Sequence, residues 1–382
     1  MAHHNTVFAE LLKLLPRHEF RKLAKDHDGP RRSDAMSRWT QFMALATAQL
    51  CGRSSLRDIE GTVASQSRSL YHLGAGQVKR TTLSRANKQL SYRFYEALFG
   101  KLYSRCQALS PGHKFKFKHK LFSLDSTLLD VSLKVFPSAE YNRMKAAYKL
   151  HVALDHDGLI PAFAAVTPGK TGDQTQAKLL NFRKGSVLVF DRGYNDYKWH
   201  NQLTDKGIFW VARIRGNAKF RVLKRYKANK GQGITSDQLI EYTSHRSKGN
   251  NLRPVRRVGY RDAETGKHYV FITNHLDWSA RTVAEIYKQR WQVELFFKWI
   301  KQNLKIKAFI GNSENAVMTQ VFVSLCIYLL LAFLKFSNGF SQSLQQISRL
   351  IHVNLFSKRT LGDLFRPPPD CKEPIPQMVL AL

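Results

Sequence analysis

The sequence predicts an α/β protein in which a mixed sheet is flanked by helices, with a mostly α-helical unit before the sheet and a β-rich insertion within it. Three observations support this prediction. Apolar residues recur at helical spacing up to about residue 112, strand-like runs replace them from Lys114 onward, and helical and strand-like segments then alternate. We expect a helical unit at 1–112, an α/β unit at 113–335, and a C-terminal helical region with a tail at 336–382.

The first unit combines helical periodicity with turn signals. AMSRWTQFMALATAQLCG and LSRANKQLSYRFYEALFGKLYSRCQAL favour helices, and DGPRRSD marks a turn between helices. Arg80 and Arg85 lie near an expected helix start, where backbone N–H groups and cationic side chains can hold phosphates. Two interpretations stay open: a DNA-binding domain of helix-turn-helix character, or an ordinary solvated basic face.

The central unit opens with three strand-like runs, followed by alternating helices and strands. The runs KHKLFSLDSTLLDVSL, AAYKLHVALDHDG and LIPAFAAVTPG favour strands because β-branched and aromatic residues dominate them. DQTQAKLLNF and YKWHNQLTDKG favour helices, and SVLVFDRG and IFWVARIR favour further strands. This order predicts a mixed sheet covered by helices.

Two later segments complete the prediction. Short β-prone runs around a polar stretch interrupt the pattern at about 216–275, and a long helix is expected over about 280–305. The most apolar stretch, Val321 to Leu334, is shorter than the roughly 20 residues needed to cross a bilayer. We therefore expect a core helix there, no membrane span, and an irregular tail after Pro367-Pro368-Pro369.

Charge and composition indicate the kind of partner. The chain has 61 Lys and Arg residues against 28 Asp and Glu, a formal net charge of +33. Such an excess favours binding to a polyanion, and 12% aromatic residues exclude a disordered basic tail. Four cysteines without a CxxC pair support neither a zinc cluster nor a disulfide framework, and the N-terminus lacks a secretion signal. We expect a cytoplasmic protein that binds nucleic acid.

Three acidic residues stand out because they lie among apolar neighbours. Asp125 is within LFSLDST, Asp191 follows the apolar run VLVF, and Glu294 is in the helical segment RWQVELFFKWI. Carboxylates at the ends of buried strands can gather around divalent cations, which activate a hydroxyl nucleophile and stabilise the leaving oxygen in phosphoryl transfer. Asp125, Asp191 and Glu294 are therefore candidate metal ligands.

The helix that carries Glu294 also carries a polar stripe. At about 100° per residue, four side chains fall within roughly 60° of one another: Tyr287, Arg290, Glu294 and Lys301. This grouping suits a metal ligand flanked by phosphate-binding groups. By spacing alone, an exposed face with an Arg290–Glu294 pair explains the pattern equally well.

The spacing Tyr287-(2)-Arg290-(3)-Glu294-(6)-Lys301 resembles the Y-R-E-K signature of the insertion-sequence-four family of bacterial DDE transposases. The segments Asp125-Ser126-Thr127 and Asp191-Arg192-Gly193-Tyr194 resemble the two aspartate motifs of that family, in the expected order. LSRAN and LPRHEFRKLAKDHDG are similar to its N-terminal domain, so the resemblance covers about 1–335.

This resemblance implies an RNase H-like core in which Asp125, Asp191 and Glu294 are catalytic and bind two Mg²⁺ ions, with Mn²⁺ as an alternative. It implies a cut-and-paste reaction on double-stranded DNA: a hydrolytic nick, a hairpin intermediate, and joining of the 3′-hydroxyl to target DNA. The implied partners are the terminal inverted repeats, the target and a second copy of the chain on DNA, in a bacterial, nucleoid-associated setting.

The resemblance also implies contacts between side chains and DNA. Tyr287, Arg290 and Lys301 would hold phosphates, and Lys298 is a further expected contact. Two interpretations stay open for Lys149 and His151: they reach the site from the strand after Asp125, or they form a cross-strand surface pair on one face.

Relatives can use a tryptophan to stabilise a flipped base, and here Trp278 and Trp210 are candidates that packing explains equally well. Two other functions stay open: a catalytically silent DNA-binding regulator of transposition, and a metal-dependent nuclease that cuts without joining.

Overall fold

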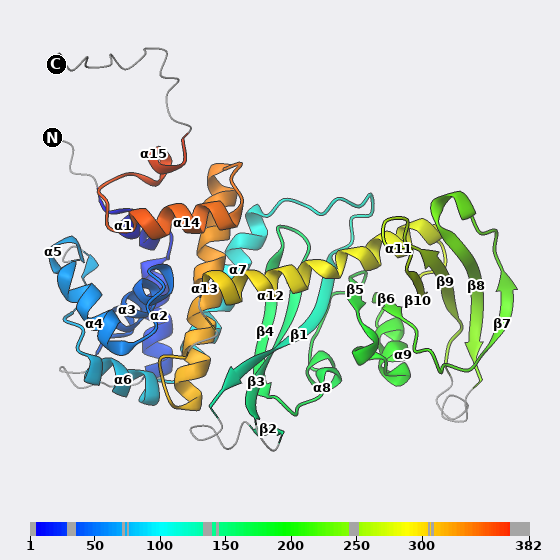
Figure 1. Cartoon of the computed structure of the whole chain (residues 1–382), viewed down its shortest axis with the longest axis horizontal. Coiled ribbons are helices and arrows are strands. Elements are labelled where there is room, and N and C mark those ends of the chain that lie inside the picture. Colours follow the sequence, from blue (N-terminus) through cyan, green and yellow to red (C-terminus); the bar gives the residue numbers. More distant parts are fainter. Residues whose placement is uncertain are drawn as a thin grey trace, which may run out of the picture.

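The computed structural model describes residues 5–28, 36–70, 73–74, 76–132, 140–142, 145–243, 252–304, 306 and 309–366. Helices from both ends of the chain gather at one end of the molecule, and a long sheet extends from them (Figure 1). The helices of this end are α1 (Val7–Lys13), α2 (Arg17–Asp28), α3 (Arg38–Leu50), α4 (Leu56–Ser65), α5 (Ser67–Leu70), α6 (Arg80–Gln89), α7 (Arg93–Leu109), α13 (Glu314–Asn338), α14 (Leu344–Asn354) and α15 (Leu361–Phe365).

Serine side chains begin many of these helices. Ser37, Ser55, Ser313 and Ser343 each accept a hydrogen bond from the backbone N–H three residues later. An N-cap of this kind satisfies a donor that the first helical turn leaves open and stabilises a helix by about 1 kcal/mol. The local sequence therefore specifies where these helices start.

Within the described residues, the sheet has ten strands. They are β1 (Leu121–Val131), β2 (Glu140–Asn142), β3 (Lys145–Asp155), β4 (Ile160–Pro168), β5 (Val187–Phe190), β6 (Phe209–Arg213), β7 (Phe220–Arg225), β8 (Ile234–Tyr242), β9 (Val255–Arg261) and β10 (His268–Thr273). β1, β3 and β4 are antiparallel neighbours, whereas β5 runs parallel to β1 and β6 runs parallel to β5.

The strands β4-β3-β1-β5-β6 lie in the order and directions of an RNase H-like sheet. Helix α8 (Asp173–Ala177) connects β4 to β5, and α9 (Tyr197–Asp205) connects β5 to β6. The predicted mixed sheet flanked by helices is thereby confirmed. The strand–helix alternation was readable because each strand is a short apolar run bounded by turn residues.

The β-rich insertion extends this same sheet. β10 pairs antiparallel with β6, and β9, β8 and β7 follow outward in that order. β8 falls in the stretch described above as polar, where no strand was predicted. Its Asp237 is buried because it forms an ion pair with Arg256 of β9, at 2.6 Å between Nη2 and Oδ2. The charged residue Asp237 interrupts the apolar pattern by which a buried strand is predicted from sequence, so β8 was not predicted.

The long helix predicted over about 280–305 is interrupted. α11 (Ala280–Gln289) and α12 (Trp291–Asn303) meet at Arg290, whose backbone N–H donates to the carbonyl of Tyr287, only three residues earlier. The prediction of one continuous helix is therefore wrong at this point. The tighter turn places Arg290 between the two helices.

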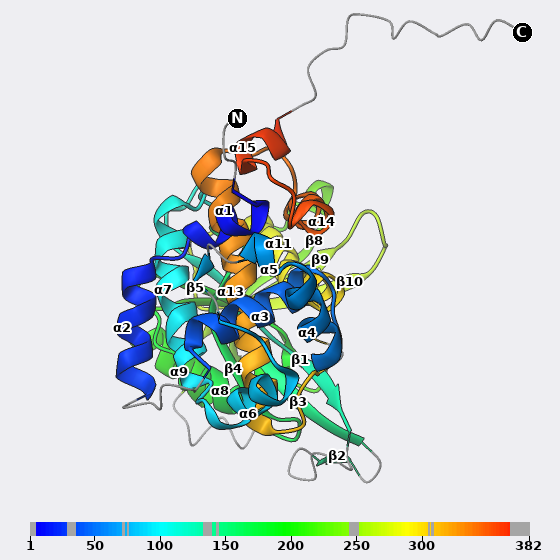
Figure 2. The ribbon, with the colours of Figure 1, turned by 90° about the vertical axis from the view of Figure 1, so that its left-hand side faces the viewer.

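Helix α13 is a core helix as predicted, but the predicted reason, that it is too short to cross a bilayer, is wrong. It has 25 residues, and its most apolar 18-residue window has a mean hydropathy of 2.3, so it is long and apolar enough to cross a membrane. However, 94% of its most apolar window is buried inside the protein. Figure 2 shows α13 among the helices of the helical end, and Phe322 stacks on Tyr92 of the neighbouring segment.

One hydrophobic core joins the helical end to the sheet. It contains side chains of α7, α12 and α13 together with residues of β1, β3 and β4. The predicted unit boundaries at 112 and 335 therefore stay predictions, because helices on both sides of them share this core. The predicted tail after Pro367 lies outside the described residues.

Candidate active site

The three predicted acids lie near the point where the pairing between β1 and β5 ends. β1 pairs with β5 only from Leu121 to Ser123, and β5 ends at Phe190. Asp125 follows on β1, and Asp191 begins a 3-10 turn after β5, where its Oδ1 accepts the N–H of Gly193 at 2.7 Å. Glu294 lies in the first turn of α12.

Arg290 joins two of these acids. Its Nη1 lies 3.1 Å from Oδ2 of Asp125, and its Nη2 donates to Oε1 of Glu294. All three side chains are mostly buried, with 15% of Arg290, 20% of Asp125 and 33% of Glu294 exposed. The Arg290–Glu294 pair is therefore part of the site, and the interpretation as an ordinary exposed pair does not hold.

Burial and the neighbouring charged groups together set the pKa of the Asp125 carboxyl group. Burial raises the pKa of Asp125 to about 6, and the negative charges of Asp191 and Glu294 act in the same direction. The N–H of Ser126 and the guanidinium of Arg290 oppose this shift without cancelling it. Asp125 therefore lies in a place that favours additional positive charge.

The chemistry of these residues fits a divalent cation. Carboxylate oxygens are the ligands that hard cations such as Mg²⁺ and Mn²⁺ prefer, and a cation would favour the charged form of Asp125, which burial disfavours. In the part of the chain that the structure describes, no three ligating side chains already surround one point. The Arg290 guanidinium between Asp125 and Glu294 accounts for this arrangement.

The other residues of the Y-R-E-K spacing are positioned differently. Tyr287 is 9% exposed, and its ring packs 4.6 Å from that of Phe271, with the Arg290 guanidinium 5.8 Å from its centre. Lys301 donates to Oγ1 of Thr127 at 2.6 Å and to the carbonyl of Leu128 at 2.8 Å. Lys301 thus ties α12 to β1.

Lys149 and His151 lie on β3, and His151 lines one small cavity together with Asp125 and Asp173. In the β1–β3 register His151 faces Ser126 and Lys149 faces Leu128, both neighbours of residues that point toward α12. Both side chains lie beside Asp173: Lys149 Nζ is 3.3 Å and His151 Nδ1 is 3.5 Å from its Oδ1. Sequence reasoning missed Asp173, whose only signal is its position at the start of a helix before β5.

Both candidate tryptophans lie in packed surroundings. Trp210 is 1% exposed, and Trp278 stacks between Phe117 and His275, so both contribute to packing. Trp291, directly after Arg290, is 55% exposed. Its place in the same helical motif was a signal that sequence reasoning did not use.

The remaining predicted DNA contacts are exposed. Lys298 lies on the outer face of α12. Arg80 and Arg85 lie on α6 at the helical end, away from the three acids (Figure 1).

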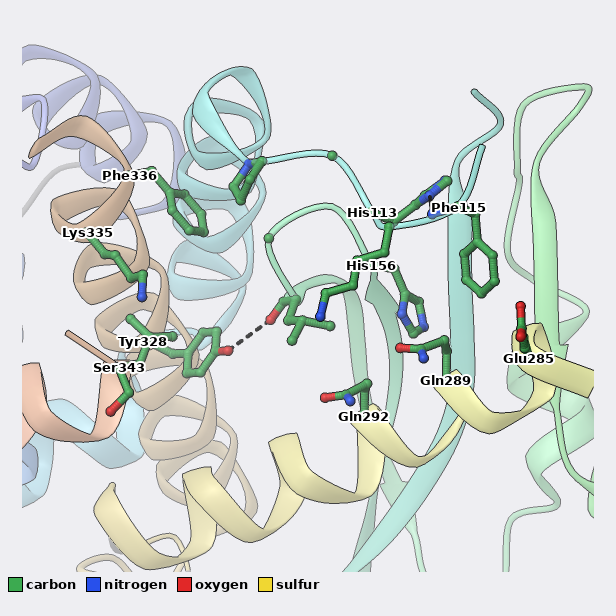
Figure 3. A pocket seen from close by; sticks show the side chains of 16 residues that line it. His113, Phe115, His156, Glu285, Gln289, Gln292, Tyr328, Lys335, Phe336 and Ser343 are labelled. Carbon is green, nitrogen blue, oxygen red and sulfur yellow. Dashed lines mark hydrogen bonds between the residues drawn. The ribbon is translucent and has the colours of Figure 1, made fainter. Parts of the chain in front are cut away.

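A separate cavity of about 660 Å³ lies on the other side of α12. Gln289 and Gln292 point into it, and Tyr328 of α13 closes it with a 2.8 Å hydrogen bond to the carbonyl of Leu159 (Figure 3). Gln292 lies roughly half a turn around α12 from Arg290 and Glu294. This cavity therefore does not belong to the acidic site.

Comparisons with known proteins agree with this arrangement. Residues 116–330 match the family model of the transposase DDE domain, and residues 3–76 match a domain of unknown function, DUF4372. Two relatives are both named as transposases. The protein y4zB of Sinorhizobium fredii is 32% identical over 252 residues, which is 64% of this chain and 69% of that protein. The protein of insertion sequence element IS5377 from Geobacillus stearothermophilus is 30% identical over 256 residues, 66% of this chain and 67% of that one.

Among solved structures, the piggyBac transposase synaptic complex with hairpin DNA matches with a TM-score of 0.48 and 10% identity. The match covers 96% of this chain and 83% of that one.

Proposed function

The chain belongs to the DDE transposase family, and from this premise we propose that it moves an insertion sequence by a cut-and-paste reaction in which Asp125, Asp191 and Glu294 are the catalytic acids. One observation supports this assignment above others. Asp125 of β1 and Glu294 of α12, 169 residues apart in the sequence, are bound by one guanidinium, and Asp191 is near enough to raise the pKa of Asp125.

DDE transposases use divalent metal ions, and Asp125, Asp191 and Glu294 would hold two Mg²⁺ ions here, with Mn²⁺ as a substitute. When bound, the ions supply activation of the attacking hydroxyl and stabilisation of the leaving oxygen. In the absence of metal ions, the positive charge of Arg290 partly balances the negative charges of Asp125 and Glu294. Its planar fork also matches a phosphate, so it exchanges carboxylate for DNA phosphate when the site is loaded.

The reaction is a series of phosphoryl transfers. Water attacks the phosphodiester at the transposon end, and the 3′-oxygen leaves as a hydroxyl. That hydroxyl attacks the opposite strand and forms a hairpin as the flanking strand leaves; a second water opens the hairpin. The freed 3′-hydroxyl then attacks target DNA. Each transfer forms one P–O bond and breaks one, so no oxidant or covalent protein intermediate is required.

DNA is the substrate. The protein cuts at the terminal inverted repeats of the element and joins the element to target DNA. Two ends must be cut, so two copies of the chain act together as a homodimer on DNA. Arg80 and Arg85 of α6 bind the repeat, while Lys298 and Trp291 of α12 lie beside the cut end. Such a protein works in the bacterial cytoplasm, at the nucleoid.

The test is metal-dependent nicking of a labelled duplex that carries the end of the element. Wild type is expected to nick with Mg²⁺, whereas Glu294→Gln and Asp191→Asn are expected to bind the duplex with unchanged affinity and leave it intact. Glu285→Gln is the matched control, because it removes a carboxylate of α11 that is paired with Arg281, away from the three acids. Nicking by Glu294→Gln at the wild-type rate would overturn the assignment.

A further inference from the structure

The sheet does not fix the distance between Asp125 and Asp191. β1 and β5 are paired only over Leu121–Ser123 and Val187–Val189, and Val187 also donates to the carbonyl of Lys120 just before β1. Asp125 lies two residues beyond this ladder, and Asp191 lies beyond the end of β5. Another element must therefore hold the two aspartates at a set separation.

Helix α8 supplies a link on the Asp125 side. Ser126 donates its hydroxyl to Oδ1 of Asp173 at 2.7 Å, and its backbone N–H donates to Oδ1 of Asp125 at 2.8 Å. Asp173 thus fixes the residue that orients the Asp125 carboxylate.

The next residue of α8 supplies the link on the Asp191 side. Gln174 donates from Nε2 to the carbonyl of Gly193 at 2.9 Å, and the N–H of Gly193 donates to Oδ1 of Asp191 at 2.7 Å. A Cβ at residue 193 would lie 2.9 Å from Oδ1 of Asp191 and 3.9 Å from Oδ2 of Asp173. A side chain at this position would therefore displace the Asp191 carboxylate.

The charge of Asp173 is compensated from β3. Lys149 lies 3.3 Å from Oδ1 of Asp173 and also donates to the carbonyl of Thr171 at 2.9 Å. His151 is held by Thr167 at 2.9 Å and lies 3.5 Å from the same carboxylate oxygen. These two residues thus fix Asp173 rather than the catalytic acids directly.

We propose that Asp173 and Gln174 are positioning residues that clamp Ser126 to Gly193 and so set the separation of the Asp125 and Asp191 carboxylates. This inference rests on the proposed function, because the separation matters for holding divalent cations. Residues that orient metal ligands typically change metal affinity by 10- to 100-fold when they are removed.

The experiment is a titration of the purified full-length protein with Mn²⁺, without DNA, followed by electron paramagnetic resonance. Asp173→Ala is expected to weaken Mn²⁺ binding by about 10- to 100-fold. Asp173→Asn is expected to rescue part of this loss, because its amide oxygen still accepts from Ser126. Ser126→Ala should weaken binding similarly, and the Ser126→Ala/Asp173→Ala double variant should add little, because both remove one link.

Two further variants keep the test decisive. Gln174→Ala removes one neutral hydrogen bond, so it is expected to fold even if Asp173→Ala does not, and it should weaken Mn²⁺ binding as well. Asp196→Asn is the matched control: this carboxylate also begins a helix and pairs with Lys178 at 2.5 Å, but it does not link Ser126 to Gly193. It should leave Mn²⁺ affinity unchanged.

The outcomes separate the two ideas. Wild-type affinity in both Asp173→Ala and Gln174→Ala, with wild type itself binding Mn²⁺, would overturn the clamp alone. Equal losses in Asp196→Asn would also overturn it, because they would indicate general loosening around α8. Failure of wild type to bind Mn²⁺ would overturn the proposed metal site and the clamp with it.

Discussion

Lys301 offers a sharp test of which residues near the acids hold the fold and which contact DNA. Its ammonium makes two hydrogen bonds to β1, to Thr127 and to the carbonyl of Leu128. A hydrogen bond from a charged donor contributes about 1.5–3 kcal/mol, and partial exposure lowers this to about 1 kcal/mol each. Lys301→Met keeps the aliphatic packing but loses both bonds, so we expect the free energy of unfolding to fall by about 2 kcal/mol.

The assay is urea unfolding followed by tryptophan fluorescence, with Lys298→Met as the matched control. Lys298 lies one helical turn earlier on α12 with an exposed side chain, so its substitution should change the unfolding free energy by less than about 0.5 kcal/mol. If Lys301→Met unfolds like wild type but loses DNA affinity, Lys301 is a phosphate ligand and its role as a brace between α12 and β1 is refuted.

Three further predictions address other parts of the molecule. Trp291→Ala should weaken binding of the transposon end about 5- to 150-fold, because stacking on a base contributes about 1–3 kcal/mol, with unfolding unchanged; unaltered affinity in a gel-shift titration would contradict this. Arg256→Met leaves the buried carboxylate of Asp237 unpaired and should lower the free energy of unfolding by about 3–5 kcal/mol; a loss below 1 kcal/mol would contradict it. Burial lowers the pKa of His156 to about 4, so its neutral form stabilises the fold above pH 6.5 and this contribution is lost as the pH falls toward 4. Between pH 7 and 5 it amounts to about 2 kcal/mol, and urea unfolding of His156→Gln should lack that share of the pH dependence; an equal dependence would refute it.

Local pattern explains why much of the fold was predictable. β5 is a short apolar run that ends just before Asp191, and β1 begins with the apolar run that precedes Asp125, so strand periodicity and direction indicate that the two acids lie near each other. The Y-R-E-K spacing placed Arg290 and Glu294 together, and the structure places them in contact. These features depend on neighbours within a few residues along the chain.

The features that sequence reasoning missed depend on tertiary contacts. β8 carries Asp237, which is tolerated in the sheet because Arg256 of the neighbouring strand β9 forms an ion pair with it. Lys301 resembles a free cation on a helix until β1 supplies its partners. Asp173 gains its role from a serine on β1 and a turn after β5, and no spacing in the chain indicates that meeting.

The most direct test of transposition is strand joining by the purified protein. The substrate is a labelled duplex that ends at the terminus of the element with its 3′-hydroxyl already free, mixed with a supercoiled plasmid and Mg²⁺. We expect wild type to attach the labelled strand covalently to the plasmid, and Glu294→Gln to bind the duplex without joining it. A wild-type protein that nicks the uncut end but never joins the pre-cut one would contradict the account and identify the chain as a nuclease.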